Sequence, residues 1–215
     1  MTVSKSIPFI LDGVQIEPRR PPQLPEIELL LMADHYPDQS LAATDYHRLM
    51  AQPPYWAFCW GGGQALARWI LDQPQQVAGR AVVDFGAGSG VAGIAAGLAG
   101  ATEVIAVDID PDALRLCTLN GVANGVSLKT ATSFNGLRHA LLLAADICYE
   151  EAGWAGVLAH IEAGGDAIVA ESRLRNLHHR HSALQLVAAY QMRTFPDLEE
   201  SENFDEVRIF STIRT

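Results

Sequence analysis

The sequence predicts an α/β fold: a doubly wound, Rossmann-like parallel sheet with a C-terminal antiparallel hairpin and an N-terminal extension. Two observations predict it. Short apolar runs alternate with helical segments between residues 81 and 170. Two β-like runs, residues 190–195 and 206–213, then close the chain with no helix between them. Because strands joined without a crossover helix pair antiparallel, we expect one of these two to run against the rest of the sheet.

The individual elements follow in order along the chain. The strands of the parallel part are expected at residues 81–85, 103–107, 126–131, 139–145 and 166–170. Helices are expected at residues 91–99, 111–124, 150–162 and 181–189, with an earlier one beginning near Gln64. Pro111 stands directly behind Asp110, an arrangement that favours a helix start. The acidic stretch between the two final strands is expected to be a solvated loop.

The chain is expected to divide into an N-terminal extension, residues 1–53, and a main domain, residues 54–215. Prolines and charged residues punctuate the extension. Residues 8–16 indicate a short hairpin around an Asp-Gly pair. Residues 26–35 carry apolar side chains at helical spacing, with acids in the first turn, and predict a helix.

A glycine-rich turn follows the first strand of the main domain. Asp84, near the end of that strand, leads into Gly86, Gly88 and Gly90, and the next strand ends before Asp108. Glycines let the backbone turn sharply and let a ligand lie against bare peptide at a helix N-terminus. An acid after the second strand can accept hydrogen bonds from both hydroxyls of a ribose. The pair therefore predicts a nucleoside site.

Asp84 indicates which nucleoside this site prefers. A dinucleotide site leaves its first turn free of charge because a pyrophosphate lies there, and a carboxylate would repel phosphate. A carboxylate suits a ligand that carries an ammonium and a sulfonium. The arrangement resembles motif I of the Rossmann-like S-adenosylmethionine methyltransferases. The alternative is an ordinary glycine-rich turn of a dehydrogenase or another α/β protein.

Composition limits the class of protein. The 215 residues, 49% of them hydrophobic, can bury one sizeable core, and no apolar run is long enough to cross a bilayer. The first ten residues lack a signal-peptide pattern. Three widely spaced cysteines argue against disulfides or a zinc site and for a reducing, cytoplasmic compartment. A net charge of −10 disfavours nucleic acid as a partner and is compatible with a cationic protein surface.

Further motifs extend the resemblance beyond the glycine turn. They are the segment from Pro54 to Arg68, with its Gly-Gly-Gln-Ala-Leu run, and the short runs Pro25-Glu26-Ile27, Asp108-Ile109-Asp110-Pro111 and Asp146-Ile147-Cys148-Tyr149. Together they resemble the seven-β-strand methyltransferases of family 16, and among them the electron-transfer-flavoprotein β-subunit lysine methyltransferases and their bacterial relatives. The resemblance covers roughly residues 8–162, and joined motifs of this kind are specific.

The resemblance implies S-adenosylmethionine as the cofactor and a set of residues that hold it. Trp60 is expected to form a wall of the cofactor site, since a sulfonium is attracted to aromatic faces. The alternative for Trp60 is core packing. The whole cofactor set is Trp60, Asp84, Gly86, Gly88, Gly90, Asp108, Ile109 and Asp146.

Asp146 and Tyr149 follow the fourth strand, at the edge where open α/β sheets bind ligands. The resemblance implies catalytic roles for both: Asp146 orients the cofactor ammonium or the incoming amine, and Tyr149 lines the acceptor channel. The alternative is a helix N-cap beside a half-buried tyrosine. A histidine cluster, residues 178–181, is expected to be a solvated loop, and no metal site is expected.

The chain departs from these relatives after the fifth strand. They carry Gly-Asp-Pro-Gly-Arg there, whereas this chain has the run from Ala170 through Glu171, Ser172 and Arg173 to Arg175. We expect Glu171 to reach the rim of the acceptor space and to help select the substrate.

These features together predict an S-adenosylmethionine-dependent N-methyltransferase. The expected acceptor is a lysine of a partner protein. Two alternatives stay open: methylation of a small amine resembling nicotinamide, and a nucleoside-binding protein without turnover. The altered run around Glu171 keeps the second of these open.

Overall fold

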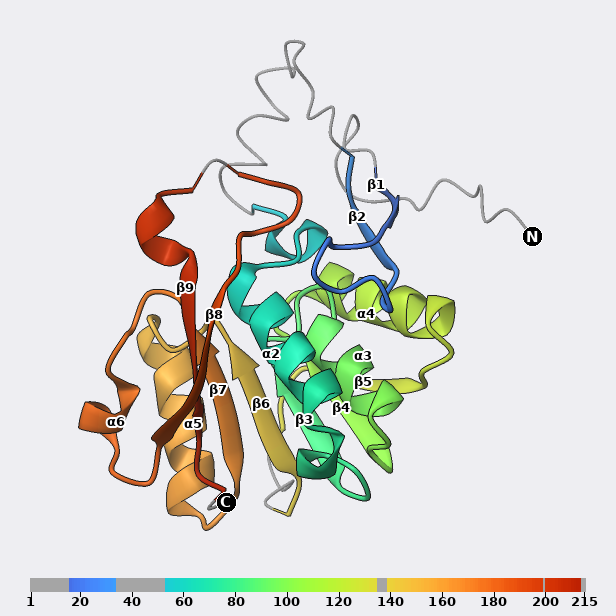
Figure 1. Cartoon of the computed structure of the whole chain (residues 1–215). Coiled ribbons are helices and arrows are strands. Elements are labelled where there is room, and N and C mark those ends of the chain that lie inside the picture. Colours follow the sequence, from blue (N-terminus) through green and yellow to red (C-terminus); the bar gives the residue numbers. More distant parts are fainter. Residues whose placement is uncertain (1–15, 34–52, 135–138, 199, 214–215) are drawn as a thin grey trace.

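A computed structural model of the protein describes residues 16–33, 53–134, 139–198 and 200–213. Its central sheet is made of β3 (Ala81–Phe85), β4 (Glu103–Val107), β5 (Leu128–Ala131), β6 (Leu141–Ala145), β7 (Ala167–Glu171), β8 (Gln185–Gln191) and β9 (Glu206–Ser211). The spatial order of the seven strands is β5-β4-β3-β6-β7-β9-β8 (Figure 1). The strands from β3 to β7 run parallel, and β9 runs antiparallel to both of its neighbours. The predicted fold class is therefore confirmed.

Helices cover both faces of this sheet. They are α2 (Gly61–Asp72), α3 (Val91–Leu98), α4 (Pro111–Ala123), α5 (Glu151–Glu162) and α6 (Leu177–Arg180), with short 3-10 turns η1 (Tyr55–Ala57), η2 (Pro74–Gln76) and η3 (Glu202–Phe204). Helices α2, α3 and α4 pack on one face, and α5 and α6 on the other (Figure 1). Strand alternation divides the core in this way: Val82 packs with the first group and Val83 with the second.

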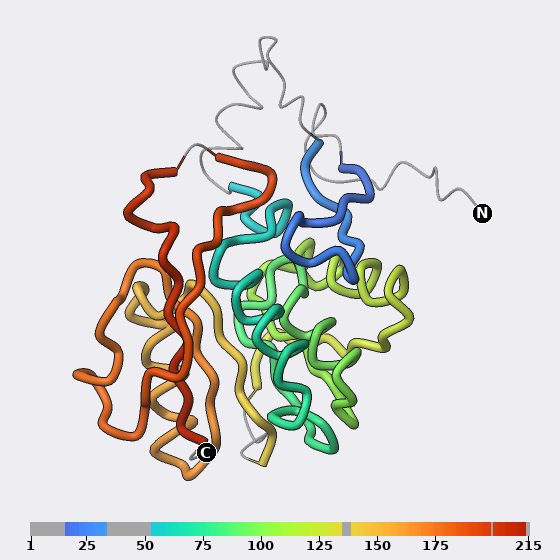
Figure 2. The backbone as a smooth tube through the Cα atoms, in the orientation of Figure 1, coloured from blue at the N-terminus to red at the C-terminus, as the bar shows by residue number. Residues whose placement is uncertain are grey.

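The described part of the N-terminal extension is a strand pair, and one expectation for it is wrong. β1 (Ile16–Arg19) pairs antiparallel with β2 (Leu29–Met32), where a helix over residues 26–35 was expected. Leu29 and Leu31 enter the main core, while the N–H of Leu30 donates to the side chain of Asn120 on α4 at 2.8 Å. This tertiary partner stabilises an extended backbone against local helical preference. Figure 2 shows the described part of the extension, in blue, running alongside the main domain.

Two further predictions concern the extension. Apart from Ile16, the hairpin expected over residues 8–16 lies outside the described residues. The domain boundary at residue 53 stays a prediction. In the described part of the chain, no helix combines the length and apolarity that a bilayer span requires.

The helix expected over residues 181–189 is also wrong. β8 occupies most of that range and pairs with β9 in an antiparallel ladder. The ladder partner decides the conformation because β9 would otherwise leave its backbone groups unpaired on that side. The short helix α6 lies earlier and carries exposed His178 and His179, so this part of the histidine cluster is helical rather than a loop.

Candidate active site

The glycine turn after β3 has a backbone that only glycine adopts easily. Gly86, Gly88 and Gly90 have φ angles of +73°, +51° and +79°. A Cβ atom on Gly86 would lie 2.7 Å from the side chain of Ile147, whereas one on Gly88 would meet no atom of the described residues within 4 Å. The turn is therefore packed from below at Gly86 and open outward at Gly88, and it leads directly into the N-terminus of α3.

Asp84 lies beneath this turn. Its side chain is 3% exposed, and Oδ2 accepts a hydrogen bond from the N–H of Gly93 in α3 at 2.8 Å. Burial raises the pKa of Asp84 to about 7, and the nearby charge of Asp108 acts in the same direction. Asp84 thus ties the end of β3 to the first turns of α3.

Asp108 is fixed at the end of β4, beside the turn. Its Oδ2 accepts from the N–H of Gly88 at 2.9 Å, and its Oδ1 accepts from the N–H of Asp110 at 3.0 Å. Asp110 in turn caps α4 by accepting from the N–H of Asp112. The next residue, Ile109, is 91% exposed. Beside the glycine turn there are therefore a fixed carboxylate, Asp108, and an exposed apolar side chain, Ile109.

Asp146 connects three elements at the carboxyl edge of the sheet. Its Oδ2 accepts from the N–H of Gly62 at 2.7 Å, and its Oδ1 accepts from the N–H and the hydroxyl of Ser172 at 3.0 and 2.8 Å. The backbone of Asp146 has a φ of +50°, which residues other than glycine rarely adopt. Burial raises the pKa of this carboxyl group, and the hydrogen bonds from Ser172 oppose that rise. Asp146 thus binds the first turn of α2, not of the helix that follows it.

Trp60 and Tyr149 meet around a third side chain that sequence reasoning did not single out. The guanidinium of Arg173 lies 6.0 Å from the ring centre of Trp60 and 5.2 Å from that of Tyr149. Tyr149 is 48% exposed and precedes α5, and the indole N–H of Trp60 donates to the carbonyl of Tyr55 at 2.8 Å. The structure therefore brings the two predicted aromatic residues to one place.

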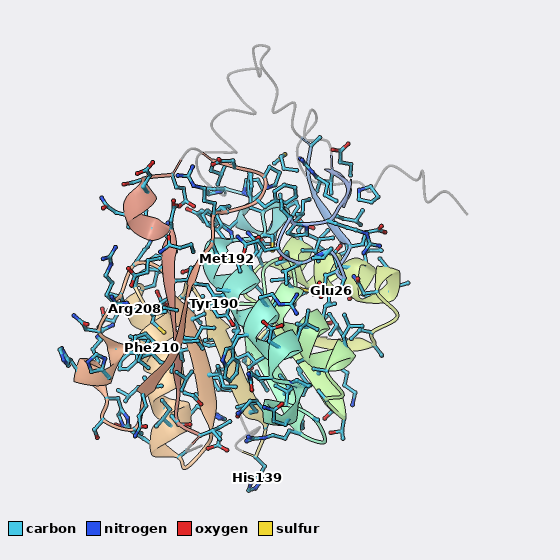
Figure 3. All side chains as sticks on the ribbon, in the orientation of Figure 1. Glu26, His139, Tyr190, Met192, Arg208 and Phe210 are labelled. Atoms are coloured by element: carbon cyan, nitrogen blue, oxygen red, sulfur yellow. The ribbon has the colours of Figure 1, made fainter. Side chains whose placement is uncertain are left out.

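A pocket opens at this edge. Trp60, Asp146 and Arg173 line it, together with residues of the segment that joins β8 to β9. That segment begins at Met192, which Figure 3 labels at the end of β8. The phenol of Tyr149 stands beside the pocket through its contact with Arg173.

The expectation that Glu171 reaches the rim of the acceptor space is wrong. Glu171 is 0% exposed, because β7 extends to include it and strand alternation turns it toward the α5 face, on the side of Val169. Its Oε1 accepts from the N–H of Cys148 at 2.5 Å, and its Oε2 has no hydrogen-bond partner among the described residues. Burial, reinforced by Asp146, raises the pKa of Glu171 to about 7. The residues of this run that line the pocket are Ser172 and Arg173, not Glu171.

The chain is similar in sequence to known methyltransferases. Residues 65–159 match the family model described as ribosomal protein L11 methyltransferase (PrmA). The chain is 42% identical over 103 residues to an electron transfer flavoprotein beta subunit lysine methyltransferase of Mus musculus, covering 46% of this chain and 40% of that protein. It is 45% identical over 74 residues to a ribosomal protein L11 methyltransferase of Citrifermentans bemidjiense, covering 34% of this chain and 24% of that protein. The matches thus span less than half the length of these relatives.

Solved structures share the fold. A 16S rRNA methyltransferase of T. thermophilus in complex with AdoMet and guanosine has a TM-score of 0.57 at 16% identity, covering 98% of this chain and 53% of that chain. A putative RNA methyltransferase from Pyrococcus horikoshii has a TM-score of 0.51 at 16% identity, covering 69% of this chain and 81% of that chain. The seven-stranded sheet is therefore that of the class I methyltransferases.

Proposed function

From the PrmA-type methyltransferase domain that this chain carries, we propose that the protein transfers the methyl group of S-adenosylmethionine to a nitrogen, and that the acceptor is a lysine of a partner protein. The observation that carries the proposal is the fixed position of Asp108 beside an outward-open glycine turn. A carboxylate held in this way can accept hydrogen bonds from two ribose hydroxyls in the position that it already has. Binding therefore costs little free energy for ordering this side chain.

The residues present fit this cofactor. Asp108 takes the ribose, Ile109 offers its exposed side chain to the adenine, and the open side at Gly88 leaves room for the nucleoside. Asp84, buried beneath the turn, supports the turn and adds negative potential below the methionine ammonium. Asp146 adds a further carboxyl group at the pocket that Trp60 also lines.

Bound S-adenosylmethionine supplies a methyl group on a sulfonium: as the acceptor nitrogen bonds to the methyl carbon, the carbon–sulfur bond breaks and the sulfur keeps the electron pair. The protein's own residues do the rest. Trp60 and Tyr149 restrict the approach to the methyl group, and Asp146 orients cationic groups at the pocket. Before transfer the lysine ammonium must lose its proton, which passes to water or to a nearby carboxylate.

Two findings support a protein acceptor. The curated relatives are methyltransferases of the electron transfer flavoprotein beta subunit and of ribosomal protein L11, and both of these targets are proteins. The net charge of −10 attracts a basic protein surface and repels a polyanion. A lysine on an exposed basic segment is therefore the proposed acceptor.

The test is incubation of the purified protein with methyl-labelled S-adenosylmethionine and a cell extract. We expect label in a protein band, released as methyl-lysine on hydrolysis. Label confined to the small-molecule fraction would replace the protein acceptor with a small amine. Binding of S-adenosylmethionine with no label in either fraction would favour a nucleoside-binding protein without turnover, and tighter binding of NAD would contradict the cofactor.

A further inference from the structure

Arg173 lies inside a cage of aromatic rings. Besides Trp60 and Tyr149, the ring of Phe204 lies 4.9 Å from the Arg173 guanidinium. Nη2 of Arg173 also donates to a carboxylate oxygen of Glu200 at 2.9 Å. The cage therefore holds one cation with three rings and one acid.

The rings and the acid of this cage come from three separate stretches of the chain. Trp60 precedes α2, Tyr149 follows β6, and Phe204 and Glu200 belong to the segment between β8 and β9. All but Tyr149 line the pocket, which also contains Asp146. Rings that converge on one point, with an acid beside them, form an arrangement that binds ammonium groups. The cage thus stands beside Asp146, the carboxyl group to which the proposed function gives the role of orienting cationic groups.

We propose that this cage is the acceptor site, that it recognises the cationic side chain of a lysine, and that Arg173 occupies it until the lysine displaces it. The assignment of lysine rests on the proposed function, whereas the recognition of a cation rests on the cage alone. Arg173 is then a specificity-determining residue: it competes with the acceptor for the same rings and the same acid.

Exchange of the Arg173 guanidinium for a lysine ammonium keeps the charge of the cage unchanged. The side chains of Arg173 and Glu200 are 26% and 24% exposed, so the guanidinium can move toward solvent without crossing the core. An incoming ammonium replaces its charge, so Glu200 is not left without a cation. Glu200 is kept in place meanwhile, because its other oxygen accepts from the hydroxyl of Thr194. A neutral side chain would leave this acid unpaired and would be rejected.

A second arginine on an aromatic ring provides a matched control. Arg180 lies 4.7 Å above the ring of Trp154 and donates to the carbonyl of Cys148, away from the residues that line the pocket. Replacing Arg180 removes the same kind of contact without opening the cage.

The experiment is an NMR titration of the protein, without cofactor, with the peptide acetyl-Gly-Lys-Gly-amide, following the indole N–H of Trp60. We expect Arg173→Ala to bind this peptide about fivefold to tenfold more tightly than the unmodified chain, and Arg180→Ala to bind like the unmodified chain. In the Arg173→Ala background, Glu200→Gln and Phe204→Ala should each remove most of the gain. The norleucine peptide should bind at least about tenfold more weakly.

Equal binding of the lysine peptide by the Arg173→Ala and unmodified chains would overturn the proposal, as would equal binding of the norleucine peptide. Arg173→Gln, which removes the charge but keeps the methylene groups of the side chain, should also bind the lysine peptide more tightly, and it controls for a local collapse of the cage in the alanine variant. Because these titrations contain no S-adenosylmethionine, their failure is separate from failure of the proposed function, which a parallel titration of that cofactor reports.

Discussion

The cofactor side and the acceptor side of this site are built in different ways. Around the glycine turn, backbone N–H groups hold the carboxylates in place. The N–H of Gly93 donates to Asp84, and the N–H of Gly88 donates to Asp108. Around the pocket, side chains from distant stretches converge on the charge of Arg173. Backbone contacts fix one geometry, whereas a cation on rings can be exchanged for another cation. The difference suggests a rigid cofactor side and an adjustable acceptor side.

The largest effect is expected where the two sides join. A Cβ atom on Gly62 would lie 2.4 Å from Oδ2 of Asp146, so Gly62→Ala must displace a carboxylate that accepts three hydrogen bonds. We expect a loss of about 4 kcal/mol in the free energy of unfolding, measured in urea, because several charge-assisted hydrogen bonds are broken together. If the clash is the cause, Gly62→Ala should cost far less in an Asp146→Ala background than alone. Equal costs in both backgrounds would contradict this account of the junction.

Glu171 provides a second test of the comparison, because it is buried directly before the residues that line the pocket on the acceptor side. Burial raises its pKa from 4.5 to about 7, so the folded state holds the proton more tightly than the unfolded state. This contribution to stability is fully present below pH 4.5 and is lost as the pH rises through about 7. The loss amounts to about 3 kcal/mol by the usual conversion of pKa differences.

Glu171→Gln should therefore reduce the fall in stability between pH 5 and pH 8, measured by urea unfolding at both values. Part of the fall should remain, since the pKa of Asp84 is raised to about 7 for the same reason and titrates in the same window. An unchanged difference between the two pH values would show that Glu171 is ionised in the folded protein at both.

A smaller effect is expected at Asn120, which links the extension to the glycine turn. Its side chain accepts from the N–H of Leu30 and donates to the carbonyl of Ser89, both at 2.8 Å, and it is 0% exposed. Asn120→Ala should cost about 2 kcal/mol in the free energy of unfolding, since it leaves two backbone groups without partners. Thr118→Ala, an exposed position on the same helix, should change stability by less than about 0.5 kcal/mol. Similar losses for both variants would contradict the link.

The sequence predicts the cofactor side far better than the acceptor side. The strands at residues 81–85 and 103–107 agree with β3 and β4, because buried parallel strands are continuous apolar runs and their glycine turn is local. The fifth strand was expected one residue too early. That single shift is enough to move Glu171 from a loop at the rim into the core, because neighbouring strand residues face opposite sides.

Residues whose conformation depends on distant partners could not be predicted in this way. Residues 29–32 form a strand because the side chain of Asn120 accepts a hydrogen bond from the N–H of Leu30, and residues 185–191 form one because β9 lies beside them. The cage around Arg173 depends on a loop that brings in Phe204 and Glu200, and no spacing in the sequence marks that meeting. The departure around Ser172 and Arg173 was the one signal, and it was assigned to Glu171 instead.

The most direct test of the account is calorimetric titration of S-adenosylmethionine into three variants. Asp108→Ala removes the carboxylate at the end of β4, Glu103→Ala removes an acid at the other end of the same strand, and Arg173→Ala empties the cage. We expect Asp108→Ala to weaken binding by about 1–3 kcal/mol, the scale of lost charge-assisted hydrogen bonds, and the other two to leave it nearly unchanged. Unchanged affinity in Asp108→Ala, or a loss as large in Arg173→Ala, would contradict the separation of a cofactor side from an acceptor side.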